Sequence, residues 1–174
     1  MHEPLYFSRM KFVITILILF VFCSCWVDSE EAQRHNNLIM VAQERVVEAF
    51  YQCDSSLMDS MGYRMFYWEY DSIDWNLKQM KQLLDTIQCP QEDTTLKSAA
   101  RNFITASAEL REKDYPLFLD AYRKYQALGQ QEDSLAMHQF WNIIIAKKNK
   151  IIENFQADQK TYFENFDLTE HRLP

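Results

Sequence analysis

The sequence predicts an all-α protein, a four-helix up-down antiparallel bundle that follows a lipoprotein signal peptide. Three observations support this prediction. Only two glycines and four prolines punctuate the 174 residues, which leaves few turns for a many-stranded sheet. Apolar residues recur at steps of three and four over long segments, and no long segment alternates with a period of two. A basic start followed by a short apolar run stands near the N-terminus, as in a secretory signal.

The targeting segment reads MKFVITILILFVFCSC from Met10 onward. Its apolar run covers residues 12–22, which is too short for a bilayer-spanning helix of about 20 residues. A small residue, Ser24, directly precedes Cys25, and this arrangement resembles a bacterial lipoprotein signal, in which that cysteine becomes the lipid-modified first residue. Phe22 stands where such signals usually have leucine. Signals that depart from the usual pattern in this way resemble those of Bacteroidetes lipoproteins. Cys25 is therefore the predicted lipidation site.

The chain is accordingly divided into four parts. Residues 1–24 are expected to be the signal peptide, with Met10 as an alternative initiator, and residues 25–32 the lipidated cysteine and a short tether. Residues 33–168 are expected to form a single helical-bundle domain, followed by a tail over residues 169–174. The acids soon after Cys25 resemble the export signal of surface lipoproteins. This pattern predicts a cell-envelope protein whose N-terminal lipid anchors it to the outer membrane, at its periplasmic face or at the cell surface.

Four helices are expected after the tether. Gly62 and the segment CPQEDT, with Pro90, separate the first three, and Gly129 is suited to a C-terminal cap before the fourth. Because the connections are short, consecutive helices should pack antiparallel. The expected ranges are Glu30 to Leu57, Tyr63 to Gln88, Thr95 to Leu128, and from Asp133 or Ser134 onward.

The same segments carry a family resemblance. The lipidated cysteine and the helices containing NNLIMVAQERVVEAF, LKQMKQLLDTI, LKSAARNFITASAELREKDYPLF and KKNKIIENFQADQKTYFENFDL resemble a family of small all-helical lipoproteins from Bacteroidetes and leptospires. The resemblance covers most of the mature chain and is one of pattern, without an invariant motif. It implies a fold and a location, and it brings no activity or catalytic residues.

Motifs for chemistry are not found in the sequence. A net charge of −7 without a concentrated basic cluster excludes nucleic acid as an expected partner. No phosphate loop, nucleophile elbow or His-Glu-x-x-His motif occurs, so we expect no catalytic residue, no metal site and no cofactor. Glu31 and His35 are one turn apart and are expected to form an ion pair or cap. Cys53 and Cys89 fall near opposite ends of the second helix, so we expect two free thiols.

Asp114 and Lys148 are charged residues on the otherwise apolar faces of the third and fourth helices. They lie equally far from a turn centred on residue 131, so we expect them to meet as an ion pair that sets the helix register. Solvent-directed side chains and a polar ligand site are the alternatives. Pro116 complicates the assignment, because it removes a helical hydrogen bond and leaves Asp114 able to cap the second half of the helix.

Trp68 and Trp75 lie two turns apart, on the side of the second helix opposite its apolar face. A neighbouring helix, a loop or the N-terminal tail would cover them in one interpretation, and insertion into a membrane interface is another. In a third they form a contact surface for a protein or glycan partner, since tryptophan is enriched at binding hot spots.

The resulting function hypothesis is a lipid-anchored, non-catalytic interaction or structural module. The alternative is a carrier that holds an apolar or amphipathic ligand within the bundle. An enzyme comes third. A large internal cavity would favour the carrier, whereas a solid core with bare tryptophans would favour the interaction module. The oligomeric state does not follow from the sequence.

Overall fold

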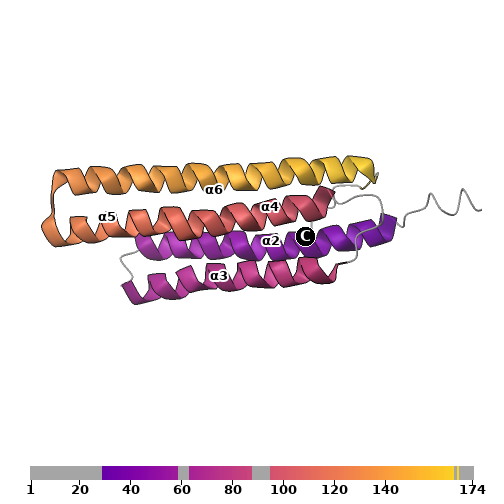
Figure 1. Cartoon of the computed structure of the whole chain (residues 1–174), viewed down its shortest axis with the longest axis horizontal. Helices are drawn as coiled ribbons and strands as arrows, with labels where there is room; N and C mark the ends of the chain where they lie inside the picture. The colour runs from indigo at the N-terminus through magenta and orange to yellow at the C-terminus, as the bar shows by residue number, and fades with distance from the viewer. Residues whose placement is uncertain (1–28, 59–62, 88–94, 167, 169–174) are drawn as a thin grey trace, which may run out of the picture.

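The described residues form a bundle of four long helical segments. The computed structural model describes residues 29–58, 63–87, 95–166 and 168, and no strand occurs among them. The third segment is continuous, with a short π-helical stretch between two α-helices. The elements are α2 (Ser29–Met58), α3 (Tyr63–Thr86), α4 (Thr95–Glu109), η1 (Leu110–Asp114), α5 (Tyr115–Leu128) and α6 (Gln131–Asn165). Consecutive segments run in alternating directions (Figure 1), which confirms the predicted all-α, up-down bundle.

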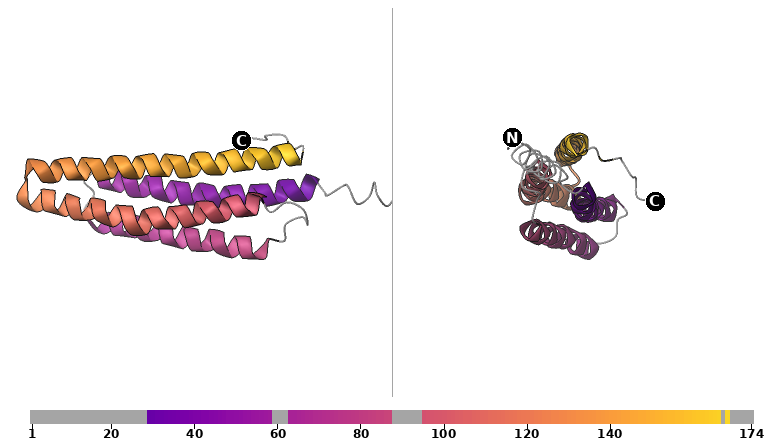
Figure 2. Two further views of the ribbon diagram at one scale, coloured as in Figure 1. Left: turned by 45° about the horizontal axis from the view of Figure 1, so that its top comes forward. Right: turned by 90° about the vertical axis from the view of Figure 1, so that its right-hand side faces the viewer.

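Two helical hairpins make up this bundle. In one, α2 packs along α3, and in the other α6 packs along both α4 and α5. The end-on view in Figure 2 places the four segments around a common centre, with α3 beside the α4 to α5 segment. Apolar side chains from every segment are buried at this centre, among them Val46, Met80, Phe103, Leu110 and Ile144. The three-to-four residue spacing of these side chains gives each helix one apolar face, and burial of those faces drives the association.

The structure corrects the prediction for the middle of the third segment. The Tyr115 backbone N–H bonds to the Leu110 carbonyl, which is the wider spacing of a π-turn. Pro116, the next residue, has no N–H and cannot continue the normal ladder. The extra residue of the π-turn accommodates the proline within a continuous segment. Asp114 precedes α5 with helical backbone angles and makes no side-chain cap, so the alternative in which it caps the second half of the helix is wrong.

The turn between the second pair of helices follows the expected chemistry. Gly129 has φ of 64° and donates its N–H to the Tyr125 carbonyl at 2.8 Å, which confirms it as the C-terminal cap of α5. Helix α6 then begins at Gln131, earlier than the predicted Asp133 or Ser134. This α5 to α6 turn projects beyond the ends of α2 and α3 (Figure 1).

Candidate functional site

The first candidate site is a row of exposed side chains on α3. Trp68 is 78 % exposed and Trp75 is 57 % exposed, whereas Phe66, Ile73 and Leu77 on the same helix are buried. A helix turns by about 100° per residue, so residues seven apart return to nearly the same side. None of the described helices covers these tryptophans, and the interpretation in which a neighbouring helix buries them is wrong. Their use as a partner surface stays a prediction.

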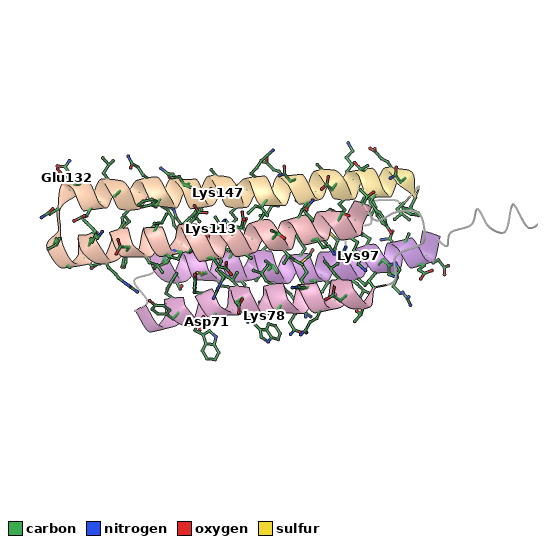
Figure 3. All side chains as sticks on the ribbon, viewed as in Figure 1. Asp71, Lys78, Lys97, Lys113, Glu132 and Lys147 are labelled. Atoms are coloured by element: carbon green, nitrogen blue, oxygen red, sulfur yellow. The ribbon has the colours of Figure 1, made fainter. Side chains whose placement is uncertain are left out.

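Charged and polar side chains share this row, with Asp71 between the two tryptophans and Lys78 after Trp75. The carboxylate of Asp71 is 79 % exposed and the ammonium side chain of Lys78 is 69 % exposed. Figure 3 shows both on α3, at the edge of the bundle. We call Trp68, Asp71, Trp75, Lys78 and Gln82 the outer face of α3.

Each charge on this face has a partner within its own chain. Arg111 Nη2 lies 3.7 Å from Asp71 Oδ1, and Lys78 Nζ lies 2.6 Å from Asp74 Oδ2 one helical turn away. Ion pairs with exposed members contribute about 0 to 1 kcal/mol, because water screens them. The outer face of α3 is therefore amphipathic, and its two charged side chains make only weak ion pairs within the chain.

The second candidate site is a buried cluster of Asp54, Tyr115 and Lys148 from α2, α5 and α6. The Tyr115 hydroxyl donates a 2.6 Å hydrogen bond to Asp54 Oδ1, and Lys148 Nζ donates to Asp54 Oδ2. All three residues are buried. Burial and the adjacent Asp54 carboxylate raise the pKa of Tyr115, so its phenol stays protonated and remains a donor. Both carboxylate oxygens of Asp54 are thus occupied by donors.

The expected pairing of Asp114 with Lys148 is corrected by this cluster. Asp114 instead accepts from Lys147 Nζ, with distances of 2.6 and 2.8 Å to its two carboxylate oxygens. Lys147 and Lys148 are consecutive, so they leave α6 about 100° apart. Lys147 meets Asp114 at the bundle surface, and Lys148 points inward to α2. The predicted axial alignment of α6 with Asp114 was therefore right to within one residue. The predicted partner of Lys148 was wrong, because Lys148 pairs with Asp54.

Sequence reasoning missed Asp54 and Tyr115. The position of Asp54 could have indicated its burial, because it follows the apolar Phe50 by one helical turn, at the margin of the apolar face of α2. Tyr115 follows the π-turn and is fully buried. Tyr51, also on α2, places its ring 4.8 Å from the Lys148 ammonium and adds a cation–π contact on the solvent side, where it is half-exposed.

Two further polar contacts join α6 to α2. Gln159 Nε2 donates to Asn36 Oδ1 at 2.9 Å, and both residues are buried. The Tyr162 hydroxyl donates to the Ala32 carbonyl at 3.3 Å. Together with the contact between Lys148 and Asp54, these bonds place polar links along α2 and along the second half of α6. We call this set of contacts the α2–α6 seam.

The π-turn supplies a polar link to the other hairpin. Because the Tyr115 N–H bonds to Leu110 and Pro116 has no N–H, the Arg111 carbonyl is left without its usual helical donor. The Tyr70 hydroxyl of α3 donates to this carbonyl at 2.7 Å, and Arg111 Nε donates back to the Tyr70 carbonyl at 3.2 Å. The Arg111 guanidinium also stacks 4.3 Å from the Tyr70 ring centre. The irregular turn thus provides the acceptor that docks α3 on the third segment.

The remaining predicted residues divide between described and undescribed parts of the chain. Cys25 and Cys89 lie outside the described residues. Cys53 is a buried free thiol whose pKa is raised by burial, which leaves it protonated and unreactive. His35 Nε2 lies 3.9 Å from Glu31 Oε1, as expected of a one-turn pair. In the part of the chain that the structure describes, no three His, Cys, Asp or Glu residues gather as a metal site would require, and no helix is long and apolar enough to cross a membrane.

Comparison with known proteins returns no relative for this chain. No protein-family model, no curated protein and no solved structure matches it.

Proposed function

We propose that this chain is a lipid-anchored cell-envelope protein that acts as a non-catalytic interaction module through the outer face of α3. The observation that carries the proposal is the exposure of Trp68 and Trp75, at 78 % and 57 %. Large aromatic side chains gain free energy when a partner removes their apolar surface from water, and tryptophan is among the residues most enriched at binding hot spots.

The polar residues buried at the centre of the bundle support a module over a carrier. Tyr115 and Lys148 are both buried at mid-height, and Phe50 stacks on the Tyr115 ring with 6.0 Å between ring centres. A carrier for an apolar ligand would need an apolar cavity at this level, whereas the contact between Asp54 and Lys148 makes the same place polar. Opening it would expose both charges to an incoming apolar ligand.

Affinity capture from envelope extracts tests the surface. The chain is immobilised as the wild type and as the double variant Trp68→Ala, Trp75→Ala, and the retained proteins and glycans are compared. The proposal expects a partner that the wild type retains and the double variant loses. Leu128→Ala with Leu135→Ala is the matched control, because both leucines are exposed and lie at the far turn. Identical partner sets for all three chains would contradict the proposed surface.

Metabolic labelling with a palmitate analogue tests the anchor separately. Cys25→Ser removes the predicted acceptor, so the label and the membrane association should both disappear. Cys53→Ser is the control, since that thiol is buried in α2 and should leave labelling unchanged. Label that persists in Cys25→Ser would refute the anchor without bearing on the outer face of α3.

A further inference from the structure

We propose that the outer face of α3 is a self-association surface, through which two copies of this chain pair in antiparallel orientation about a two-fold axis beside Trp75. The inference rests on the proposed function, because it names a second copy of the chain as the partner of the same tryptophans. Two-fold pairing is the commonest form of protein self-association and requires a surface that is complementary to itself.

The spacing of the outer face suits a helix partner. Trp68, Asp71, Trp75, Lys78 and Gln82 follow one another at alternating steps of four and three residues. That is the spacing of the contact seam between two helices that cross at a shallow angle. All five residues are exposed, so no described helix of the same chain packs on the outer face of α3. A second α3 can lie along it without displacing a buried contact.

The order of charges along the face selects the antiparallel orientation. Asp71 lies four residues before Trp75, and Lys78 lies three residues after it. In an antiparallel pair centred on Trp75, each Lys78 comes beside Asp71 of the other copy, and the two tryptophans at position 75 meet near the axis. A parallel pair would instead place Asp71 against Asp71 and Lys78 against Lys78, which costs free energy twice.

The existing local pairs permit this arrangement. Asp71 contacts Arg111 only at 3.7 Å, so its carboxylate keeps room for a second cation. Lys78 has three ammonium donors and uses one on Asp74, at 2.6 Å. A second copy therefore adds two symmetric ion pairs around a desolvated aromatic centre. Aromatic residues, which are enriched in specific interfaces, then lie on both sides of each ion pair, with Trp75 at the axis and Trp68 farther from it.

The charge of α3 disfavours a lipid surface as the occupant. From Phe66 onward, the helix has two basic side chains against a larger number of acidic ones, which are Glu69, Asp71, Asp74 and Asp85. Anionic headgroups attract helices with clustered lysine and arginine. A helix with an excess of acidic side chains gains nothing from them, whereas a second copy supplies the matching charge for both Asp71 and Lys78.

Charge reversal tests the pairing in the full chain, solubilised in a nonionic detergent, with the dimer dissociation constant measured by sedimentation equilibrium. Asp71→Lys and Lys78→Asp each convert two attractive contacts into two repulsive ones, so each should weaken the dimer about tenfold. The double variant D71K/K78D restores both attractions and should dimerise like the wild type. Mixing the two single variants should produce a heterodimer that is tighter than either homodimer.

Matched reversals on α6 are the control. Lys160 and Glu164 form an exposed one-turn pair at 4.0 Å, so Lys160→Glu and Glu164→Lys change the same charges away from α3. They should leave the dissociation constant unchanged, and circular dichroism should show the same helix content for every variant. A wild type that stays monomeric at millimolar concentration, or single reversals that dimerise as well as the wild type, would overturn self-association.

The Trp68→Ala, Trp75→Ala chain separates this failure from failure of the proposed function. If the wild type is monomeric and the tryptophan variant still loses an envelope partner, the interaction module stands and self-association falls. If the wild type is monomeric and no partner is lost, both fall. Binding to anionic vesicles that the tryptophan variant loses and the charge reversals keep would assign the face to a membrane and overturn the pairing.

Discussion

The α2–α6 seam holds charged side chains inside the bundle, whereas the outer face of α3 holds two tryptophans outside it. In the seam, Lys148 and Asp54 are buried, and each has lost its water. On the outer face of α3, the side chains of Trp68 and Trp75 stay mostly exposed to water. The difference shows that burial does not simply follow side-chain polarity. The buried charges of Asp54 and Lys148 are compensated by the bonds that replace their hydration, whereas the rings of Trp68 and Trp75 are exposed although they are largely apolar.

The two regions should respond to mutation in opposite ways. Removing a member of the seam leaves its partner buried without compensation and should strongly lower the free energy of unfolding. Removing a tryptophan from the outer face removes little packing and should leave that free energy almost unchanged. This contrast would be contradicted if truncating a side chain of the α2–α6 seam left the free energy of unfolding unchanged, or if removing the tryptophans lowered it.

The largest expected effect is that of Lys148→Ala. It leaves the Asp54 carboxylate buried without its cation, which costs about 3 to 5 kcal/mol of unfolding free energy. Lys147→Ala is the matched control, because that lysine is half-exposed and pairs with Asp114 at the surface. It should cost about 1 kcal/mol or less. Urea denaturation followed by circular dichroism measures both, and equal losses would contradict the inward assignment of Lys148.

A smaller effect is expected from Tyr115→Phe. The ring stays and the hydroxyl is lost, so Asp54 Oδ1 keeps no donor at its 2.6 Å position. An unsatisfied buried acceptor costs about 1 to 3 kcal/mol. Tyr122→Phe on the same helix is the control, since that ring is only partly buried against the core. If the two variants unfold at the same urea concentration, the Tyr115 hydroxyl does not support Asp54.

His35, near the start of α2, is expected to give the protein a modest loss of stability in acid. Burial of His35 lowers its pKa below the ordinary value of 6.5, with Arg34 and Lys97 acting in the same direction and Glu31 against them. The folded state then binds fewer protons than the unfolded state, so stability is complete above pH 6.5 and falls as the pH drops below it. His35→Gln should flatten this slope between pH 7.5 and 5, and His138→Gln, an exposed control, should keep it. A slope that is unchanged in His35→Gln would refute the assignment.

The smallest effect on stability is expected for Trp68→Ser with Trp75→Ser. Both rings project into solvent, so the unfolding free energy should change by about 0.5 kcal/mol or less. Phe66→Ser, on the buried side of the same helix, should cost several times more, because it removes core packing. If the tryptophan variant loses as much stability as Phe66→Ser, the outer face of α3 is part of the fold and its proposed role falls.

Much of the bundle follows from local patterns. The apolar spacing of α2 and α3 placed both helices to within two residues at each end, and Gly129 marked the turn before α6. The outward position of Trp68 and Trp75 also followed, because rotation about one helix depends only on residue number. The π-turn could not be predicted from the sequence, since Pro116 is compatible with a kink, a break or an inserted residue. The structure contains the inserted residue, together with the packing of Tyr70 against Arg111.

The sequence by itself determined four amphipathic helices, their alternating directions, and an inward lysine on the last of them. Only the tertiary structure decided which carboxylate meets that lysine. Asp54 and Lys148 are 94 positions apart in the chain, and their approach depends on the rotation and axial shift of α2 and α6. Periodicity gives the rotation only approximately and leaves the axial shift open, because each helix presents the same apolar face at every turn. Close packing of the side chains sets both, and it thereby sends Lys147 to Asp114 and Lys148 to Asp54.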